Sequence, residues 1–263
     1  MIIIGEKLNS SIPRVLNAFS AKDSGYIIGL IKAQEAAGAD FLDVNTAICG
    51  KDEQVVMEWV IGLVLDNSKC GIMIDSPSAE IILKMIPLIK DRKFIINSIS
   101  LVDRIEELLK TLVLADCGIV CLPIGEKGMP KSLNEKLKNT ERLIERLTEN
   151  GVRNENIYID ILLEALATEI ESGKNAISTI KELKLKYPEV HAICGLSNIS
   201  FGLPDRVNIN SAFLAAAIIA GLDSVIMDIT NSESRKILYA SRALAGKDDF
   251  CVDYIKTSRR RGE

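Results

Sequence analysis

The run Gly71-Ile72-Met73-Ile74, followed by Asp75 and Ser76, is a clear example of the pattern that decides the fold. Short apolar runs that end in a polar or turn residue recur between longer helical patterns, as repeated βα units require. Eight such runs can be counted, and eight parallel strands close a barrel, whereas five or six leave an open sheet. We therefore expect an α/β protein with a (β/α)₈ TIM-barrel fold. The predicted strands are residues 2–5, 40–44, 71–74, 94–96, 118–122, 157–159, 191–194 and 224–227.

The segments between these runs carry apolar residues at three- and four-residue spacing, as Ile105, Leu108 and Leu112 do. This spacing is typical of helices that pack one face on a sheet, so we expect a layer of outer helices. Ser100 or Asp103 is a candidate cap for the helix after the fourth strand. Glycines just past helical patterns are expected to adopt the left-handed conformation that ends a helix. They are Gly38, Gly151 and Gly221.

The composition fits one large domain, residues 1–263, with an interior of branched aliphatic side chains. Hydrophobic residues make up 48% of the chain and aromatic residues only 5%, and Val, Ile and Leu dominate barrel interiors. A formal net charge of −4 provides no broad basic surface, so nucleic acid is not an expected partner. The absence of G-x-x-x-x-G-K-[ST] and of G-x-G-x-x-G after a strand disfavours nucleotide hydrolysis and dinucleotide redox chemistry.

The sequence predicts neither secretion nor a membrane association. The apolar start, Met1 to Ile4, is too short for a signal-peptide core and has no basic lead. The longest apolar run, residues 212–222, is shorter than the roughly 18 residues of a membrane span. Six cysteines without a secretion signal are most simply reduced thiols. We therefore expect a cytoplasmic protein.

The cysteines and the histidine do not predict a metal site. Cys117 and Cys121 are four residues apart, but no second cysteine pair or nearby histidine completes a ligand set. Cys121 and Cys194 lie in apolar runs, where a small buried hydrophobe is expected. His191, the only histidine, begins a strand and therefore lies at the end of the barrel that serves stability. We expect His191 to be structural and no metal to be bound by this chain.

Carboxylates and carboxamides follow most of the predicted strands, and the carboxyl ends of parallel strands meet at one mouth of a barrel. Each such residue taken singly is also a common helix cap, but the set exceeds what capping needs. Acids and amides without basic partners suit a donor-rich ligand that is not strongly anionic, because phosphate calls for Lys, Arg or helix N-termini. A pterin ring fits this description. The set is Glu6, Asn9, Asp43, Asn45, Asp75, Asn97, Asp160, Ser197, Asn198 and Asp228.

Several motifs at these strand ends resemble those of the pterin-binding methyltransferases. The resemblance is greatest to the methyltetrahydrofolate:corrinoid methyltransferases and weaker to the folate-binding domain of cobalamin-dependent methionine synthase. It extends in order from Met1 to about Asp253, and it implies a single pterin-binding TIM-barrel domain. The motifs are Ile3-Ile4-Gly5-Glu6-Lys7-Leu8-Asn9, Asp43-Val44-Asn45, Ile74-Asp75-Ser76, Ile96-Asn97-Ser98, Tyr158-Ile159-Asp160 and Gly195-Leu196-Ser197-Asn198-Ile199-Ser200-Phe201-Gly202.

The resemblance implies which residues hold the pterin ring. In the family an aspartate after the third strand, an asparagine after the fourth and an aspartate after the sixth do so, and Asp75, Asn97 and Asp160 match them. The ligand would be tetrahydrofolate or methyltetrahydrofolate. Further candidates at the mouth are Glu6, Asn9, Asp43, Asn45, Ser76 and Asp228.

Asn198 is the candidate catalytic residue, because the matching asparagine of the family faces N5 of the pterin. An amine anion is a poor leaving group unless N5 is protonated or its charge is hydrogen-bonded. A carboxamide can donate to N5 and stabilise the transition state more than the ground state. Gly195 and Ser197 would line the same ring, and Arg206 would approach the pterin or the glutamyl tail. The alternative role for Asn198 is a helix cap.

The resemblance also implies that a methyl group moves between N5 and the cobalt of a corrinoid (cobalamin) carried by a separate protein. The corrinoid-domain signature D-x-H-x-x-G cannot occur here, because His191 is preceded two residues earlier by Glu189. The corrinoid protein would dock over the mouth. A homodimer is the assembly that the family implies.

Two other functions stay open. Dihydropteroate synthase shares the barrel and the pterin pocket but needs an Arg-Lys pair after Gly-x-Ser, where this chain has Asn198-Ile199. A non-catalytic folate-binding protein would keep the pocket without moving a methyl group. The sequence does not determine the direction of net transfer, the identity of the corrinoid partner, the polyglutamate preference or the source of the N5 proton.

Overall fold

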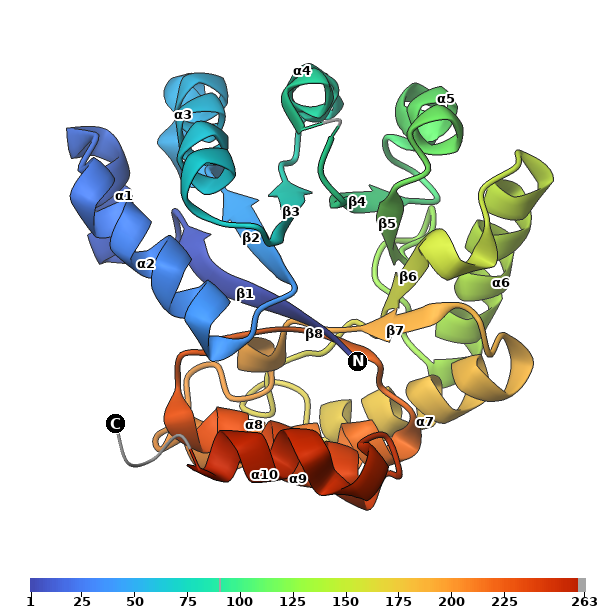
Figure 1. The fold of residues 1–263 in the computed structure, drawn as a ribbon. Coiled ribbons are helices and arrows are strands. Elements are labelled where there is room, and N and C mark those ends of the chain that lie inside the picture. The colour runs from blue at the N-terminus through green and yellow to red at the C-terminus, as the bar shows by residue number, and fades with distance from the viewer. Residues whose placement is uncertain (90, 260–263) are drawn as a thin grey trace.

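The computed structural model describes residues 1–89 and 91–259, and eight parallel strands form its centre (Figure 1). Strands consecutive in sequence are neighbours from β1 to β7, and β8 pairs with β1. β7 and β8 meet at the bridge between Gly195 and Ile226, where Ile226 N donates to Cys194 O at 2.9 Å. This nearly closed barrel confirms the predicted TIM-barrel fold. The strands are β1 Ile2–Asn9, β2 Phe41–Asn45, β3 Gly71–Asp75, β4 Phe94–Ser100, β5 Gly118–Leu122, β6 Ile157–Asp160, β7 His191–Ile193 and β8 Ser224–Met227.

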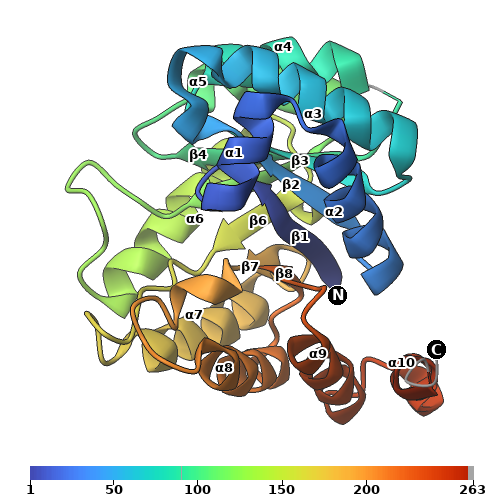
Figure 2. The same cartoon turned by 90° about the vertical axis from the view of Figure 1, so that its left-hand side faces the viewer.

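Helices surround the barrel on its outer face, as the apolar spacing predicted (Figures 1 and 2). Two helices, α1 and α2, follow β1, and α10 packs on α9 after the last βα unit. The helices are α1 Pro13–Ala21, α2 Ser24–Ala37, α3 Glu53–Asn67, α4 Ala79–Ile89, α5 Ile105–Ala115, α6 Leu133–Glu149, α7 Ser172–Lys186, α8 Arg206–Ala220, α9 Ser232–Leu244 and α10 Val252–Arg259.

Buried apolar side chains form two separate cores. The larger core lies between the strands and the surrounding helices and includes Phe19, Ile61 and Leu143. The smaller core fills the barrel itself, because side chains along each strand alternate between the two faces. The barrel is therefore a packed support for its mouth and not a pore. The inner core consists of Ile4, Met73, Ile95, Val120, Tyr158 and Ile193.

The predicted helix ends are correct and one predicted helix start is wrong. Gly38, Gly151 and Gly221 all have positive φ angles of 92° to 119°, as left-handed ends require. Neither Ser100 nor Asp103 caps α5, whose N-cap is Arg104 without a side-chain cap bond. Ser100 instead ends β4 and its backbone pairs with Asp103. The strand continues past its predicted end at residue 96 as far as Ser100, and α5 begins only at Ile105, so Ser100 lies in the sheet and too far from the helix to cap it.

Asp223 connects the ends of β7 and β8 where strand pairing is sparse. Its carboxylate accepts hydrogen bonds from Lys184 Nζ at 2.7 Å and from Ala192 N at 2.9 Å, and it lies 3.2 Å from His191 Nδ1. The His191 ring also stacks on Tyr158, with a centroid distance of 4.5 Å. His191 thus lies at the amino-terminal end of the barrel in a structural network, away from the mouth.

All six cysteines are free thiols, and Cys70, Cys117, Cys121 and Cys194 are buried. Burial raises the pKa of Cys117 to about 12 and also raises the pKa of Cys121 and of Cys194. These thiols are therefore protonated core groups, as predicted for Cys121 and Cys194. Within residues 1–89 and 91–259, every helix is too short or too polar to cross a membrane.

Candidate active site

Four polar residues lie side by side, at the carboxyl ends of β1 to β3 and in the middle of β4. Asn9 pairs with Asn45, Asn45 with Asp75, and Asp75 with Asn97 in the register of the parallel strands. Paired residues of neighbouring strands point to the same face of a sheet. The structure therefore brings these four predicted residues into one row at the barrel mouth.

Asp75 lies at the centre of this row and is held by its neighbour. Asn45 Nδ2 donates to Asp75 Oδ2 at 2.7 Å, and Asn45 Oδ1 accepts from Ala47 N at 3.2 Å, which fixes the amide orientation. Burial raises the pKa of Asp75 to about 6, although the Asn45 hydrogen bond and the Arg104 charge oppose this rise. Asp75 is thus a desolvated carboxylate that gains from any further hydrogen-bond donor.

Asp43 lies deeper in the barrel, two residues before Asn45 on β2. It is 2% exposed, and its Oδ1 has no hydrogen-bond partner among the described residues. Burial, followed by the charges of Asp75 and Glu6, raises the pKa of Asp43 well above its ordinary value. Two adjacent carboxylates in a desolvated site do not both ionise readily, so Asp43 favours its neutral form beside Asp75.

Asp160 ends β6 on the other side of the mouth. Its Oδ1 accepts from Leu162 N at 2.7 Å. Burial raises the pKa of Asp160 to about 6, opposed by the Leu162 hydrogen bond and by the charge of Lys136. A second desolvated carboxyl group, able to accept a ligand donor, therefore faces the row that contains Asp75.

Lys136, on α6, was not predicted as part of this site. The residue is only 8% exposed, and its Nζ donates to Ile161 O at 2.8 Å. In the sequence it precedes Thr140, Leu143 and Leu147 at the spacing of a buried helix face. A lysine in the apolar stripe of a helix was the signal that could have identified it.

Gly195 and Asn198 fit closely together in the loop after β7. A Cβ atom built on Gly195 would lie 3.3 Å from Asn198 Nδ2, so the carboxamide folds back over a position that has no side chain. Asn198 is exposed, whereas Ser197 Oγ donates to Glu6 Oε1 at 2.8 Å across the mouth. Burial raises the pKa of Glu6, and the Ser197 hydrogen bond opposes this rise. The Asn198 carboxamide is therefore exposed beside Gly195 in the loop after β7.

Arg206 forms hydrogen bonds with two residues of the loop after β7. Its Nη2 donates to Ser197 O at 2.6 Å and its Nε to Ser200 Oγ at 3.0 Å. Arg206 also begins α8, so the loop that carries Asn198 is tied to the helix that follows it. These contacts hold the backbone at Ser197, next to Asn198.

An irregularity in β1 turns two consecutive side chains toward the mouth. The register with β2 shifts between Gly5 and Leu8, and such bulges redirect side chains. Lys7 Nζ lies 2.6 Å from Asp228 Oδ2 beyond β8, while the adjacent Glu6 contacts the loop after β7. A regular strand would have pointed these two neighbours to opposite faces.

The expectation that the acids and amides have no basic partners was wrong. Lys7 pairs with Asp228, Lys136 approaches Asp160, and Arg104 Nη1 donates to Ser76 O at 2.7 Å near Asp75. These cations come from a bulge, a helix and a loop, so strand-end residues alone did not reveal them. They reduce the net negative charge of the mouth, and Lys7 also contacts a carboxylate oxygen of Asp228 directly.

Two predicted residues support turns at the mouth. Ser76 is 1% exposed, and its Oγ donates to Glu53 Oε1 at 2.5 Å while accepting from Ser78 N. Asn9 Oδ1 accepts from Ser11 N at 2.8 Å. Both contacts are of the kind expected for residues that shape a loop.

Within the described part of the chain, no group of three or more His, Cys, Asp or Glu residues has the arrangement of a metal site.

Comparison with known proteins agrees with this geometry. Residues 9–228 match the family of pterin binding enzymes. The chain is 34% identical over 262 residues to the methylcorrinoid:tetrahydrofolate methyltransferase of Eubacterium limosum, covering 98% of this chain and 96% of that protein. It is also 32% identical over 276 residues to the methionine synthase of Mycobacterium leprae (strain TN), of which it spans 22%.

Solved structures share the fold at low sequence identity. A dihydropteroate synthase of Coxiella burnetii, solved with pteroic acid, superposes with a TM-score of 0.72 at 14% identity, covering 93% of each chain. The dihydropteroate synthase of Yersinia pestis gives a TM-score of 0.67 at 16% identity, with 93% of each chain covered. By the extent of the family match and of the identity to its relatives, this chain belongs to the family of pterin binding enzymes.

Proposed function

We propose that this protein transfers a methyl group between N5 of tetrahydrofolate and the cobalt of a corrinoid carried by a separate protein. The observation that carries the proposal is the exposed carboxamide of Asn198, folded over Gly195 opposite the row of acids and amides. The identity to the Eubacterium limosum methyltransferase along nearly the whole chain supports the same reaction.

The pterin ring would lie between Asp75, Asn97 and Asp160. The 2-amino group and the ring N–H are donors and the ring carbonyl is an acceptor, which suits two carboxylates and an amide. Because burial raises the pKa of Asp75 and of Asp160 to about 6, donors from the ligand would stabilise the ionised forms. Most of the binding free energy of the ring is therefore assigned to these three residues.

Asn198 would hydrogen-bond to N5 while the methyl group leaves or arrives in line. Donation to a nitrogen whose charge changes during the reaction stabilises the transition state preferentially. Gly195 leaves room for the carboxamide, and Arg206 holds its loop through the carbonyl of Ser197. Glu6 and Ser197 would complete that side of the ring.

The corrinoid protein would dock over the mouth, on a ring of apolar side chains from five different βα loops. These loops follow β2, β4, β5, β6 and β7, and each exposes one large apolar residue. The exposed fractions are 58% for Ile48, 53% for Val102, 45% for Met129, 83% for Ile170 and 69% for Phe201. Exposed apolar groups around a polar pocket are typical of a protein interface.

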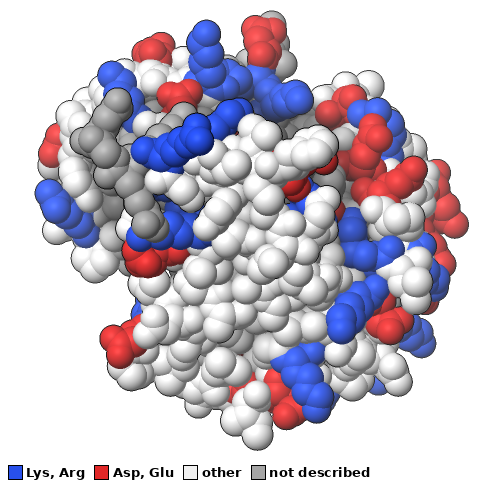
Figure 3. All heavy atoms as spheres, turned by 60° about the horizontal axis from the view of Figure 1, so that its bottom comes forward, with Lys and Arg blue, Asp and Glu red and all other residues white. Residues whose placement is uncertain are grey.

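We also propose a homodimer that uses the outer face of α8. The helix has no charged residue after Arg206, and the side of the molecule formed by the last helices shows a broad surface without charged groups (Figure 3). Ala212, Ala216 and Ile219 are exposed on this helix. Ala216→Arg would place a charge in the interface and convert the dimer to a monomer in sedimentation experiments, whereas Ala21→Arg on α1 would not.

The free thiols fit a cytoplasmic location.

Dihydropteroate synthase chemistry is disfavoured, because its Arg-Lys pair is replaced by Asn198 and Ile199, and Ile199 is 1% exposed. A folate-binding protein without activity is the remaining alternative. The deciding experiment mixes the protein with methyltetrahydrofolate and free cob(I)alamin and follows the loss of cobalt(I) absorbance. Rapid loss of the cobalt(I) absorbance that requires both the protein and methyltetrahydrofolate supports the proposal. Binding of both ligands without this loss would establish the binding protein instead.

A further inference from the structure

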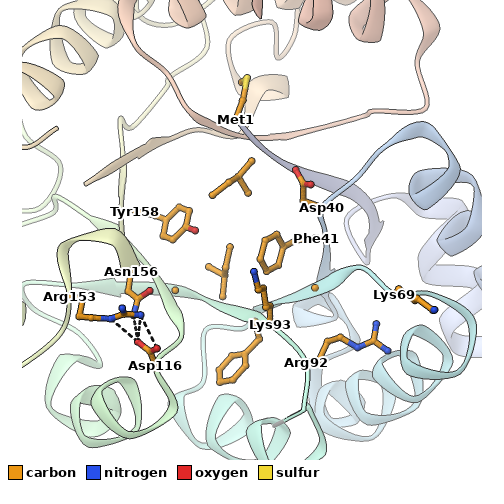
Figure 4. Close-up of a pocket in the computed structure, with 15 residues that line it drawn as sticks. Met1, Asp40, Phe41, Lys69, Arg92, Lys93, Asp116, Arg153, Asn156 and Tyr158 are labelled. Atoms are coloured by element: carbon orange, nitrogen blue, oxygen red, sulfur yellow. Dashed lines mark hydrogen bonds and ion pairs between the residues drawn. The ribbon is translucent and has the colours of Figure 1, made fainter. Parts of the chain in front are cut away.

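A hollow lies at the end of the barrel opposite the mouth, at the amino-terminal ends of the strands (Figure 4). It has a volume of about 620 Å³, within the range of pockets that bind small organic ligands. Phe41 and Gly71, which line it, are the first residues of β2 and β3. Asn45 and Asp75, in the row described above, end the same two strands. The hollow is therefore separated from the mouth by the inner core of the barrel.

Aromatic and aliphatic side chains form the floor of this hollow. Phe41, Ile95 and Tyr158 line it, and the hydroxyl of Tyr158 points inward (Figure 4). Tyr158 is held from behind by the stacked His191 ring at 4.5 Å, and burial raises the pKa of its phenol to about 12. The floor thus offers a flat apolar surface with one neutral hydroxyl donor.

Most charged groups at the rim already have partners. Asp116 accepts hydrogen bonds from Arg153 and Asn156, and Asp40 Oδ2 accepts from Ile3 N at 2.8 Å. The guanidinium of Arg92 donates to the carbonyl of Ser68 at 2.7 Å, and to those of Cys70 and Leu65. The Asp116 carboxylate is therefore paired with the Arg153 guanidinium, and the Asp40 carboxylate is held by a backbone N–H.

Lys93 is different. Its side chain points into the hollow beside Phe41 (Figure 4). Its ammonium group has no hydrogen bond or ion pair with any residue in 1–89 or 91–259. Lys69 also lies at the rim, but it points away from the centre of the hollow. The hollow thus combines an apolar floor, one inward hydroxyl and one lysine, Lys93, that points inward and has no partner among residues 1–89 and 91–259.

We propose that this hollow binds a small aromatic anion, such as an aromatic carboxylate. The ring would lie on Phe41 and Tyr158, and the carboxylate would accept from the Lys93 ammonium and the Tyr158 hydroxyl. The inference does not depend on methyl transfer at the mouth. Lys93 takes no part in the proposed chemistry, so Lys93→Gln keeps the activity of the mouth.

The test uses protein labelled with 3-fluorotyrosine, which reports on five tyrosines, with Tyr158 assigned through Tyr158→Phe. Titration with benzoate should shift the Tyr158 fluorine signal saturably and leave Tyr26, Tyr187, Tyr239 and Tyr254 in place. Acetate, which lacks the ring, and benzyl alcohol, which lacks the charge, should bind at least about tenfold more weakly. Lys93→Gln should weaken benzoate binding by a similar factor, whereas the rim control Lys69→Gln should change it less than about twofold.

Absence of a saturable Tyr158 shift would overturn the proposal. Equal effects of Lys93→Gln and Lys69→Gln would also overturn it, since they would indicate general charge attraction. Benzyl alcohol binding as tightly as benzoate would show an apolar pocket and not an anion site. Failure of methyl transfer in the same preparation would leave each of these results interpretable, because the two sites lie at opposite ends of the barrel.

Discussion

Asn45 donates from Nδ2 to Asp75 Oδ2 at 2.7 Å, and this bond connects two neighbouring strands at the mouth. It favours the ionised form of Asp75, whose pKa burial has raised to about 6. Asn45→Leu should therefore raise the pKa of Asp75 further. Pterin affinity should fall as the pH decreases through about 6 in the unaltered protein, and through a higher pH in Asn45→Leu. Calorimetric titration with tetrahydrofolate between pH 5 and 8 measures both midpoints, and an unchanged midpoint would contradict this role.

Asn198→Ala should slow methyl transfer by about 10² to 10³-fold, as loss of a transition-state hydrogen bond does. The Kd for methyltetrahydrofolate should change much less, because the bond strengthens mainly in the transition state. Single-turnover rates and equilibrium binding separate the two effects. Gly195→Ala, whose Cβ would crowd Asn198 Nδ2 at 3.3 Å, should reproduce part of the rate loss. The exposed Asn17→Ala on α1 is the matched control, and equal losses of rate and affinity in Asn198→Ala would contradict the assignment.

Asp160→Asn should mainly weaken pterin binding, by about tenfold or more, because charge-assisted hydrogen bonds contribute in both ground and transition states. Lys136 would then lose the charge of Asp160 and keep only that of Glu164, which adds to the loss. Fluorescence titration with the folate measures Kd, and the rate at saturating folate measures what remains of catalysis. Asp66→Asn on the exposed side of α3 serves as the control. A variant that binds normally but transfers slowly would reverse the roles assigned to Asp160 and Asn198.

Phe201→Asp and Ile170→Asp should reduce the rate with a protein-bound corrinoid and leave the rate with free cobalamin unchanged. The two side chains are 69% and 83% exposed on loops at the mouth, so a negative charge there disrupts a protein interface without entering the pterin site. The control is Leu114→Asp, which is 86% exposed at the end of α5. Equal losses with both forms of corrinoid would mean that these residues act inside the site.

Asp223→Asn should lower the free energy of unfolding at pH 7 by about 3 kcal/mol, since it breaks a partly buried ionic network. Burial alone would raise the pKa of Asp223, but the neighbouring His191 ring and the hydrogen bond from Lys184 outweigh burial and lower it. The ionised carboxylate therefore stabilises the fold above the ordinary pKa of about 4. This contribution is lost as the pH falls through the lower pKa of the folded state. Urea unfolding at pH 7 and pH 3 should show the difference between the two proteins shrinking at pH 3, and a constant difference would contradict the ionic origin.

The position of each strand was predictable because a buried strand needs a short apolar run, and such a run can be recognised from the local sequence alone. Residues 71–74 were predicted as a strand and form β3, which also includes Asp75 as its last residue. The extension of β1 from residue 5 to Asn9 was not predictable, because the polar pair Glu6 and Lys7 interrupts its alternation. Only the bulge, with contacts to the loops after β7 and β8, accommodates two polar neighbours on one face.

The sequence by itself determined the fold class, the strands and which acids and amides stand at their carboxyl ends, since these depend on local periodicity and on the direction of parallel strands. The tertiary structure decided the register that aligns Asn9, Asn45, Asp75 and Asn97. It also decided which cations approach the acids. Lys136 and Arg104 come from a helix and a loop, and their distance from Asp160 and Asp75 depends on how whole elements pack, which no short stretch of sequence specifies.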